Sequence, residues 1–418
     1  MIRRLPPSIG ALVARGASIL ASFALTVVVA RVLPVAGAGS FFVVYTVGAV
    51  VATFGRYGID TLAIKLLGGG ASAPGELRHG WQLVTLAGTI GAVAFGGILS
   101  AMSVHELGGP GVLWAALTIP PQALAVVAGA VLRSRGRMIA GIIAELGSIP
   151  SVTCLILLVA RLGPGVNLDG AVGALALATW LTAAWSVPLA VRASAGHRSS
   201  SVGAGSFIEF LRRRGAALSS MMATALIFYA VAWAPVLTLT MVGRPEEVAW
   251  VTAAARLANM VTLVPSIQVS YLAPQFSSLY HGGAIVELNR LARASSRRAL
   301  LVVVVPSLLL AVAAPQLVSL LYGPEFEEAA PLLSVLAVGA LLVVGMGQVN
   351  QLMLICDFER WGLALSVAVV AVWATLGLWL ASQQGAEGVV VLSAVGNVAY
   401  AAVAAALLRL KRGVRSSI

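Results

Sequence analysis

The sequence predicts an all-α polytopic membrane protein with about twelve transmembrane helices in two pseudo-symmetric six-helix bundles. The first observation is composition: 59% of the 418 residues are hydrophobic and 10% are charged, whereas a soluble domain has about 25% charged residues. The second is that apolar segments long enough to span a bilayer, about 20 residues each, recur along the chain. The third is the distribution of arginine, which crowds into alternate connecting segments. Because cationic loops resist translocation, those segments and both termini are predicted to be cytoplasmic.

Arginine distribution also accounts for the net charge of +12. The arginine-bearing segments are 3–4, 65–78, 133–137, 192–214, 290–298, 360 and 409–415. The intervening connections carry only Arg161 and Arg244, together with most of the acidic residues. In a soluble protein such a charge would suggest nucleic acid, but here the topology explains it, so no nucleic-acid partner is expected. The two cysteines lie in or beside apolar spans without metal or disulfide spacing, so no metal site is expected.

Each predicted span is an apolar run bounded by charged, glycine-containing or proline-containing connections. The twelve lie at 9–33, 39–67, 80–102, 110–132, 138–160, 168–191, 216–241, 248–275, 299–322, 329–354, 361–381 and 386–408. The longest polar interval, 192–215, is rich in Ser, Gly and Arg and divides the spans six and six. We therefore predict an N-terminal bundle at 1–195, a cytoplasmic linker at 196–215, and a C-terminal bundle with a short basic tail at 216–418. Six spans per half would make the two halves parallel repeats.

Arginines inside the spans are the most informative polar residues. Arg15, Arg56 and Arg256 lie in the first, second and eighth spans. Burying arginine in lipid costs at least a few kcal/mol, so such residues usually face a cavity, a partner or a substrate. Three converging guanidinium groups would bind an anion and suit phosphate. Simpler interpretations stay open. Arg15 could reach the lipid headgroups of the inner leaflet, and Arg56 could pair with Asp60 four residues later. No catalytic constellation or nucleotide-binding loop is present, so an enzyme is not expected.

Other polar residues in the spans are weaker candidates. Asn259, one turn from Arg256, and the group Gln348, Asn350 and Gln351 either line a substrate path or hydrogen-bond between helices. Away from the span ends, the two acids inside spans are Asp60 and Glu145. They are candidates for coupling to a proton or sodium ion, although Glu145 could instead pair with a cavity arginine. No other cofactor is expected.

Two regions then resemble a known family. Residues 30–34 (Ala-Arg-Val-Leu-Pro), 37–41 (Gly-Ala-Gly-Ser-Phe) and 54–61 (Phe-Gly-Arg-Tyr-Gly-Ile-Asp-Thr) are similar to the opening of polysaccharide-export flippases. Pro34 departs from the usual glycine. Residues 320–326 (Leu-Leu-Tyr-Gly-Pro-Glu-Phe) and 329–333 (Ala-Ala-Pro-Leu-Leu), followed by Asn350-Gln351, are also similar. The chain thus resembles O-antigen-type flippases of the multidrug/oligosaccharidyl-lipid/polysaccharide (MOP) exporter superfamily.

The resemblance implies a MATE-like fold, alternating access, and an oligosaccharide carried on undecaprenyl diphosphate. The expected function is translocation of that lipid from the cytoplasmic to the outer leaflet of a bacterial inner membrane, for surface polysaccharide synthesis. Related lipid II flippases carry cavity arginines on the first, second and eighth helices, the helices of Arg15, Arg56 and Arg256. Expected partners are the lipid-linked oligosaccharide, membrane lipids, and a polysaccharide polymerase and glycosyltransferases. A multidrug/cation antiporter of the same superfamily and a lipid II flippase are the alternatives.

Overall fold

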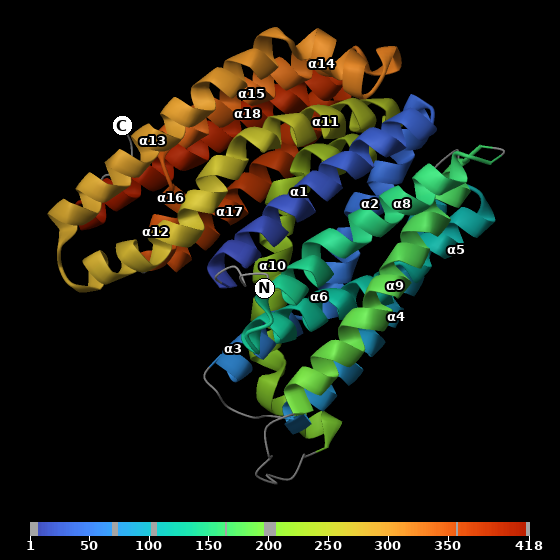
Figure 1. The fold of residues 1–418 in the computed structure, drawn as a ribbon, viewed down its shortest axis with the longest axis horizontal. Coiled ribbons are helices and arrows are strands. Elements are labelled where there is room, and N and C mark those ends of the chain that lie inside the picture. Colours follow the sequence, from blue (N-terminus) through green and yellow to red (C-terminus); the bar gives the residue numbers. More distant parts are fainter. Residues whose placement is uncertain are drawn as a thin grey trace, which may run out of the picture. The chain divides into compact units, whose positions relative to one another are not determined.

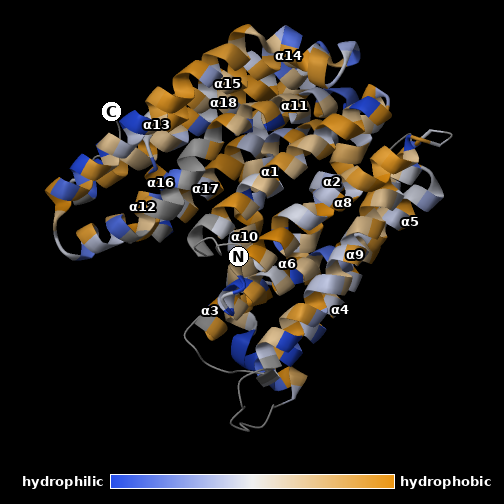
Figure 2. Cartoon of the chain, viewed as in Figure 1, coloured by the Kyte–Doolittle hydropathy of each residue, from blue (hydrophilic) through white to orange (hydrophobic). Residues whose placement is uncertain are grey.

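The computed structural model describes residues 7–68, 74–101, 107–163, 165–195, 206–356 and 358–414. Within these ranges all regular secondary structure is helical, which confirms the all-α prediction (Figure 1). Ten helical segments of the described chain are long and apolar enough to cross a membrane. Hydrophobic residues cover the helix bodies, while hydrophilic residues gather near helix ends and connections (Figure 2). The chain is therefore a multi-pass membrane protein.

The chain divides into two compact units, residues 1–230 and 231–418. The division falls inside one long helix, α10 (Phe207–Val242). This helix begins nine positions before the predicted seventh span and takes in part of the predicted linker. Residues 196–205 of that linker lie outside the described residues. The prediction of a boundary at the linker stays a prediction.

In the first unit, α6 is the central helix. It packs against α2, α3, α4, α7 and α9. The helices that form this unit with the first part of α10 are α1 (Pro7–Val32), α2 (Val35–Arg56), α3 (Ile59–Gly68), α4 (Pro74–Ala101), α5 (Gly109–Leu117), α6 (Ile119–Ser134), α7 (Met138–Ile142), the π-helical turn η1 (Ile143–Gly147), α8 (Ser148–Ala160) and α9 (Leu168–Ala195). Small residues allow this packing: a Cβ added at Gly129 would lie 2.8 Å from the Gly141 carbonyl oxygen.

The predicted second span, 39–67, is two helices rather than one. Tyr57 and Gly58 both adopt positive φ, at 48° and 73°, and separate α2 from α3. Hydropathy averaged over a whole span does not register this break, because the segments on both sides are predominantly apolar. Gly58 lies against α10, where an added Cβ would be 2.8 Å from the Leu218 carbonyl oxygen. The Tyr57 hydroxyl lies 3.0 Å from that of Ser219, so the break is docked onto α10.

In the second unit, α15 holds the corresponding central place, packing against α11, α13, α14 and α18. The elements are α11 (Pro245–Ala258), the 3₁₀ turn η2 (Asn259–Thr262), α12 (Leu263–His281), α13 (Ile285–Val312), α14 (Ala314–Leu321), the 3₁₀ turn η3 (Pro324–Phe326), α15 (Ala329–Met346), α16 (Val349–Ile355), α17 (Glu359–Val372), the π-helical turn η4 (Trp373–Gly377) and α18 (Leu378–Arg412). In both units, then, the helix of the fourth predicted span forms the centre.

Several predicted spans of this unit are interrupted. The eighth breaks at η2, just before Pro265, whose ring nitrogen has no hydrogen for the helical ladder. The tenth breaks at Gly347, which has φ 85°. The ninth begins at Ile285, so the arginine cluster at 290–298 lies on a helix. The last two form one helical run kinked at Gly385, where φ is 62°.

Candidate functional site

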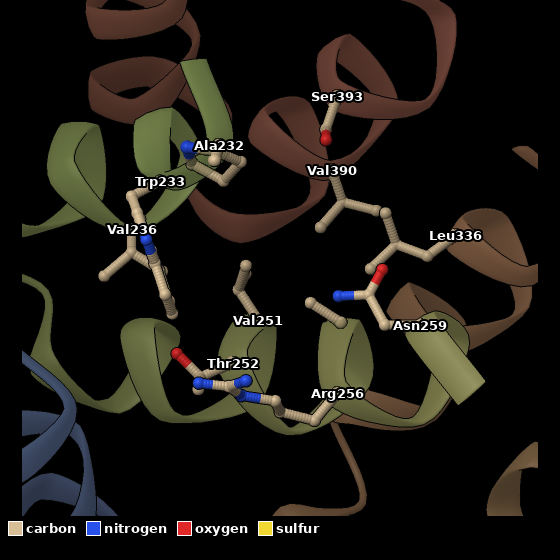
Figure 3. A pocket seen from close by; sticks show the side chains of 12 residues that line it. Ala232, Trp233, Val236, Val251, Thr252, Arg256, Asn259, Leu336, Val390 and Ser393 are labelled. Carbon is tan, nitrogen blue, oxygen red and sulfur yellow. The ribbon is translucent and has the colours of Figure 1, made fainter. Parts of the chain in front are cut away.

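A cavity of about 230 Å³ lies inside the second unit, between α10, α11, α15 and α18 (Figure 3). Its lining residues are Ala232, Trp233, Pro235, Val236, Val251, Thr252, Ala255, Arg256, Asn259, Leu336, Val390 and Ser393. Of these described residues, Arg256 alone carries a charge. An apolar wall with few polar groups is the usual construction of a binding site for a small ligand or group. The cavity thus suits an anionic group of modest size.

Arg256 is held in this cavity by helix geometry and by an aromatic ring. It lies in the last turn of α11, where the helix dipole favours a cation. Its guanidinium carbon is 5.3 Å from the centre of the Trp233 ring, a cation–π contact that fixes its position. Within the described residues no carboxylate forms an ion pair with Arg256. Its positive charge is therefore available to a ligand.

Thr252 is a site residue that sequence analysis missed. It lies one turn before Arg256 on the same face of α11 and is 4% exposed. Its Oγ1 has no hydrogen-bond partner among the described residues. Figure 3 shows the Ser393 hydroxyl and the Asn259 amide directed toward the cavity. The i, i+4 spacing of Thr252 and Arg256 was the available signal, whereas nothing in the sequence linked Trp233 or Ser393 to them.

Arg56 has a matching local setting in the first unit, but its charge is balanced. It lies in the last turn of α2, and its guanidinium carbon is 5.5 Å from the centre of the Tyr229 ring. It donates hydrogen bonds to Asp60 at 3.0 Å and to Thr53 at 2.7 Å. The simpler interpretation of Arg56, pairing with Asp60, is present in the structure. Tyr229 and Trp233 are one helical turn apart along α10.

Glu145 pairs with Arg133, a residue that the arginine pattern had assigned to a cytoplasmic connection. Glu145 lies in the π-helical turn η1, and both side chains are largely buried, at 22% and 25% exposure. The charges of Asp60 and Arg15 also act on Arg133. Arg15 itself is exposed on α1. The structure thus gathers Arg15, Asp60, Arg133 and Glu145 into one group of charges in the first unit.

The Arg133–Glu145 ion pair is expected to stabilise the folded protein. Glu145→Gln should cost about 1–3 kcal/mol of unfolding free energy, because it leaves a largely buried guanidinium without its acid; partial exposure keeps the figure below that of a fully buried pair. Adding Arg133→Gln should recover part of the loss. Thermal unfolding of the four proteins of this double-mutant cycle in detergent measures the coupling, expected at about 0.5–3 kcal/mol. Strictly additive effects would show that the pair contributes nothing.

The polar residues predicted as substrate contacts in the tenth span, Gln348, Asn350 and Gln351, lie at or just after the break between α15 and α16. Gln348 precedes α16, and its side-chain nitrogen and oxygen are buried with no hydrogen-bond partner among the described residues. Asn350 is exposed and Gln351 is half-buried. None of the three is among the described residues that line the Arg256 cavity. Of the predicted substrate-binding residues, the cavity therefore brings together Arg256 and Asn259.

Taken together, the fold and this cavity define a class: a multi-pass α-helical membrane protein of two units, with a cationic internal pocket. No family model and no curated protein matches the sequence. Solved structures do match its fold. A mutant of the MATE transporter VcmN from Vibrio cholerae is 16% identical, with a TM-score of 0.60 over 97% of this chain and 96% of that one.

Two further structures show the same similarity. One is an inward-facing multidrug resistance MATE family transporter of the MOP superfamily, 16% identical, with a TM-score of 0.67 over 97% of this chain and 98% of that one. The other is the lipid II flippase MurJ in an inward closed conformation, 11% identical, with a TM-score of 0.71 over 97% of this chain and 87% of that one. The chain therefore has a MATE-like fold, as the sequence predicted.

Proposed function

We propose that this protein is a flippase that moves an oligosaccharide linked to undecaprenyl diphosphate from the cytoplasmic to the outer leaflet of a bacterial inner membrane. The observation that carries the proposal is Arg256, a cation in an internal cavity whose charge no described carboxylate balances. A guanidinium group binds phosphate oxygens with two parallel hydrogen bonds. The MATE-like fold supports transport by alternating access, and the undecaprenyl carrier follows from the family resemblance.

Charge distribution favours an anionic substrate over a cationic drug. A carboxylate without an arginine partner would favour a cationic drug, but Asp60 and Glu145 are each paired with an arginine. No described residue that lines the Arg256 cavity is acidic. Outward movement of negative charge would also be favoured by an inside-negative potential, at about 2.3 kcal/mol per charge per 100 mV. Lipid II carries the same diphosphate chemistry, so a lipid II flippase remains the second candidate.

Asp60 and Glu145 are the proposed coupling residues for a proton or sodium ion. Because each is paired with an arginine, neutralising either carboxylate would release a guanidinium group, Arg56 or Arg133. The released cation could then bind substrate phosphate, which would link the coupling ion to the substrate. Arg15, Gln348, Asn350 and Gln351 remain proposed contacts along the path. Glycosyltransferases would supply the substrate, and a polymerase would consume it after translocation.

A gene deletion tests the function. Deletion should remove one surface glycan and cause lipid-linked oligosaccharide to accumulate on the cytoplasmic side, and the wild-type gene should restore both. Blots of the membrane fraction control for expression. A second assay, efflux of cationic dyes, should show no change. If every surface glycan survives deletion while dye efflux falls, the antiporter is the correct function. Loss of peptidoglycan precursor transport would instead identify a lipid II flippase.

A further inference from the structure

Helix α13 of the second unit changes character along its length. Its first half, residues 285–298, carries four arginines, Arg290, Arg293, Arg297 and Arg298, whereas its second half, 299–312, carries no charged residue. Figure 2 shows this change, from hydrophilic near α12 to hydrophobic further along the helix. α13 is one of the segments long and apolar enough to cross a membrane. Its basic half is therefore expected at a bilayer surface, with the apolar half in the hydrocarbon.

Three of the arginines share one face of α13. Arg290, Arg293 and Arg297 follow one another at spacings of three and four residues, and at 3.6 residues per turn they lie within about 60° of one another. All three residues are exposed. The buried residues of α13 occupy the other side of the helix and are Leu288, Ala292, Ser295, Ser296, Ala299, Val303 and Ser307. The three arginines therefore point away from the core of the unit, and we call them the α13 stripe.

The face that carries the α13 stripe continues into the apolar half of the helix. Leu301, Val305, Leu308 and Val312 follow Arg297 at spacings of three or four residues, and they are 74%, 59%, 50% and 79% exposed. On a helix that crosses a membrane, apolar side chains exposed to this extent are in contact with lipid acyl chains. A lipid whose chains lie along this face would place its headgroup beside the α13 stripe.

The charge of the α13 stripe is not balanced by an acid. Within the described residues no carboxylate forms an ion pair with any of its three arginines. The Arg293 Nε donates to the backbone carbonyl oxygen of Asn289 at 3.3 Å, a contact that positions the guanidinium group without neutralising it. Glu287 is the one acid of α13, and it is exposed and lies outside the stripe. The basic half of α13 thus keeps a net positive charge and attracts anions.

The end of α18 brings further positive charge to the same end of the second unit. α13 and the end of α18 share one buried apolar cluster, and the Asn289 Nδ2 donates to the Gly413 carbonyl oxygen at 2.9 Å. Arg409 and Lys411 are exposed there. The Lys411 Nζ lies 4.3 Å from the centre of the Trp361 ring, which is 45% exposed. Because tryptophan is enriched where membrane helices meet lipid headgroups, this end of the unit has the composition of a headgroup layer.

We propose that the α13 stripe binds the phosphate groups of anionic phospholipids whose acyl chains cover the apolar half of the same face. A guanidinium group donates two parallel hydrogen bonds to a phosphate, and basic clusters beside a membrane helix attract anionic headgroups. Membrane topology requires only that arginines are numerous in a connection, not that they align on one exposed face. A soluble anion would match the arginines but would leave the apolar continuation of the face unused. The inference is independent of the proposed function, because it concerns the lipids around the protein and not the lipid that it carries.

Native mass spectrometry of the full chain in detergent tests the α13 stripe. The protein is titrated with phosphatidylglycerol and, separately, with zwitterionic phosphatidylcholine, and the affinity for the first lipid bound is measured. The wild-type protein should bind phosphatidylglycerol at least about tenfold more tightly than phosphatidylcholine. The triple variant Arg290→Gln/Arg293→Gln/Arg297→Gln should lose this preference. The corresponding triple lysine variant should keep most of it, because lysine retains the charge that attracts the headgroup.

A matched control removes the same charge from the first unit. Arg78, Arg192 and Arg212 are exposed and belong to other arginine-bearing segments of the sequence. Replacing these three with glutamine should leave the affinity for the first phosphatidylglycerol within about twofold of the wild type, because none of them belongs to the stripe. Thermal unfolding in detergent checks that both triple glutamine variants are folded, as expected for substitutions of exposed residues.

Three outcomes would overturn the inference. Equal losses of affinity in the two triple glutamine variants would mean that anionic lipid follows total positive charge and not the α13 stripe. An unchanged preference in the stripe variant would place the lipid elsewhere. Displacement of phosphatidylglycerol by an equal concentration of inorganic phosphate would identify a site for a soluble anion. The glycan assay is separate from this titration, so failure of the flippase proposal would leave the stripe standing, and the reverse also holds.

Discussion

Arg256→Ala will reduce surface glycan export at least about tenfold and cause lipid-linked oligosaccharide to accumulate inside. The substitution removes the one charge among the described residues that line the cavity, and hydrogen bonds to charged groups contribute about 1.5–3 kcal/mol, or roughly 10–100-fold. Arg256→Lys should have an intermediate effect, since lysine keeps the charge but loses the planar fork and much of the stacking on Trp233. Glycan quantification in the rescued deletion strain measures all three variants.

Two comparisons make the Arg256 result specific. Arg161→Ala removes an exposed arginine that does not line the cavity, and it should leave export unchanged at equal expression. Thr252→Val removes the unpartnered hydroxyl while preserving shape, and it should weaken export less than Arg256→Ala does. Full rescue by Arg256→Ala would show that this cavity is not the substrate site, even if the flippase function holds.

Gly58→Ala will lower the stability of the first unit by about 2–5 kcal/mol. At φ 73° an L side chain costs about 1–2 kcal/mol, and overpacking against a fixed neighbour costs about 1–3 kcal/mol more. The neighbours here are the Leu218 carbonyl oxygen and the Met221 Cβ, each 2.8 Å from an added Cβ. The expected fall in melting temperature is on the order of 5–15 °C, measurable by thermal unfolding in detergent.

Gly97→Ala is the matched control for Gly58. Gly97 lies inside α4, and among the described residues no atom beyond its own turn of helix lies within 4 Å of an added Cβ. Alanine is the better helix former by up to about 1 kcal/mol, so the melting temperature should stay the same or rise slightly. A Gly58→Ala protein that melts with the wild type would mean that the α2–α3 break tolerates an L side chain, and that its docking on α10 does not fix the backbone.

The amino-acid sequence determined the fold class and singled out Arg256, the one charged residue among the described residues that line the candidate site. Its apolar runs and its arginine pattern predicted an α-helical, multi-pass membrane chain, because the energy of placing each segment in lipid is a local property of composition. Arg256 stood out for the same reason: placing a charged side chain in an apolar span costs free energy, and this cost can be recognised without knowing how the helices pack. The Arg56–Asp60 pair was also readable, since its partners are four residues apart.

Tertiary structure alone decided where the spans break and which side chains meet. Hydropathy measures how much apolar surface a segment carries, not its backbone angles, so it did not locate the breaks at Tyr57–Gly58 and Gly347 within spans that are apolar on average. Trp233 reaches Arg256 from another helix, and Arg133 on α6 pairs with Glu145 in η1. Such contacts depend on how helices pack, which is a property of many residues together and not of any one segment.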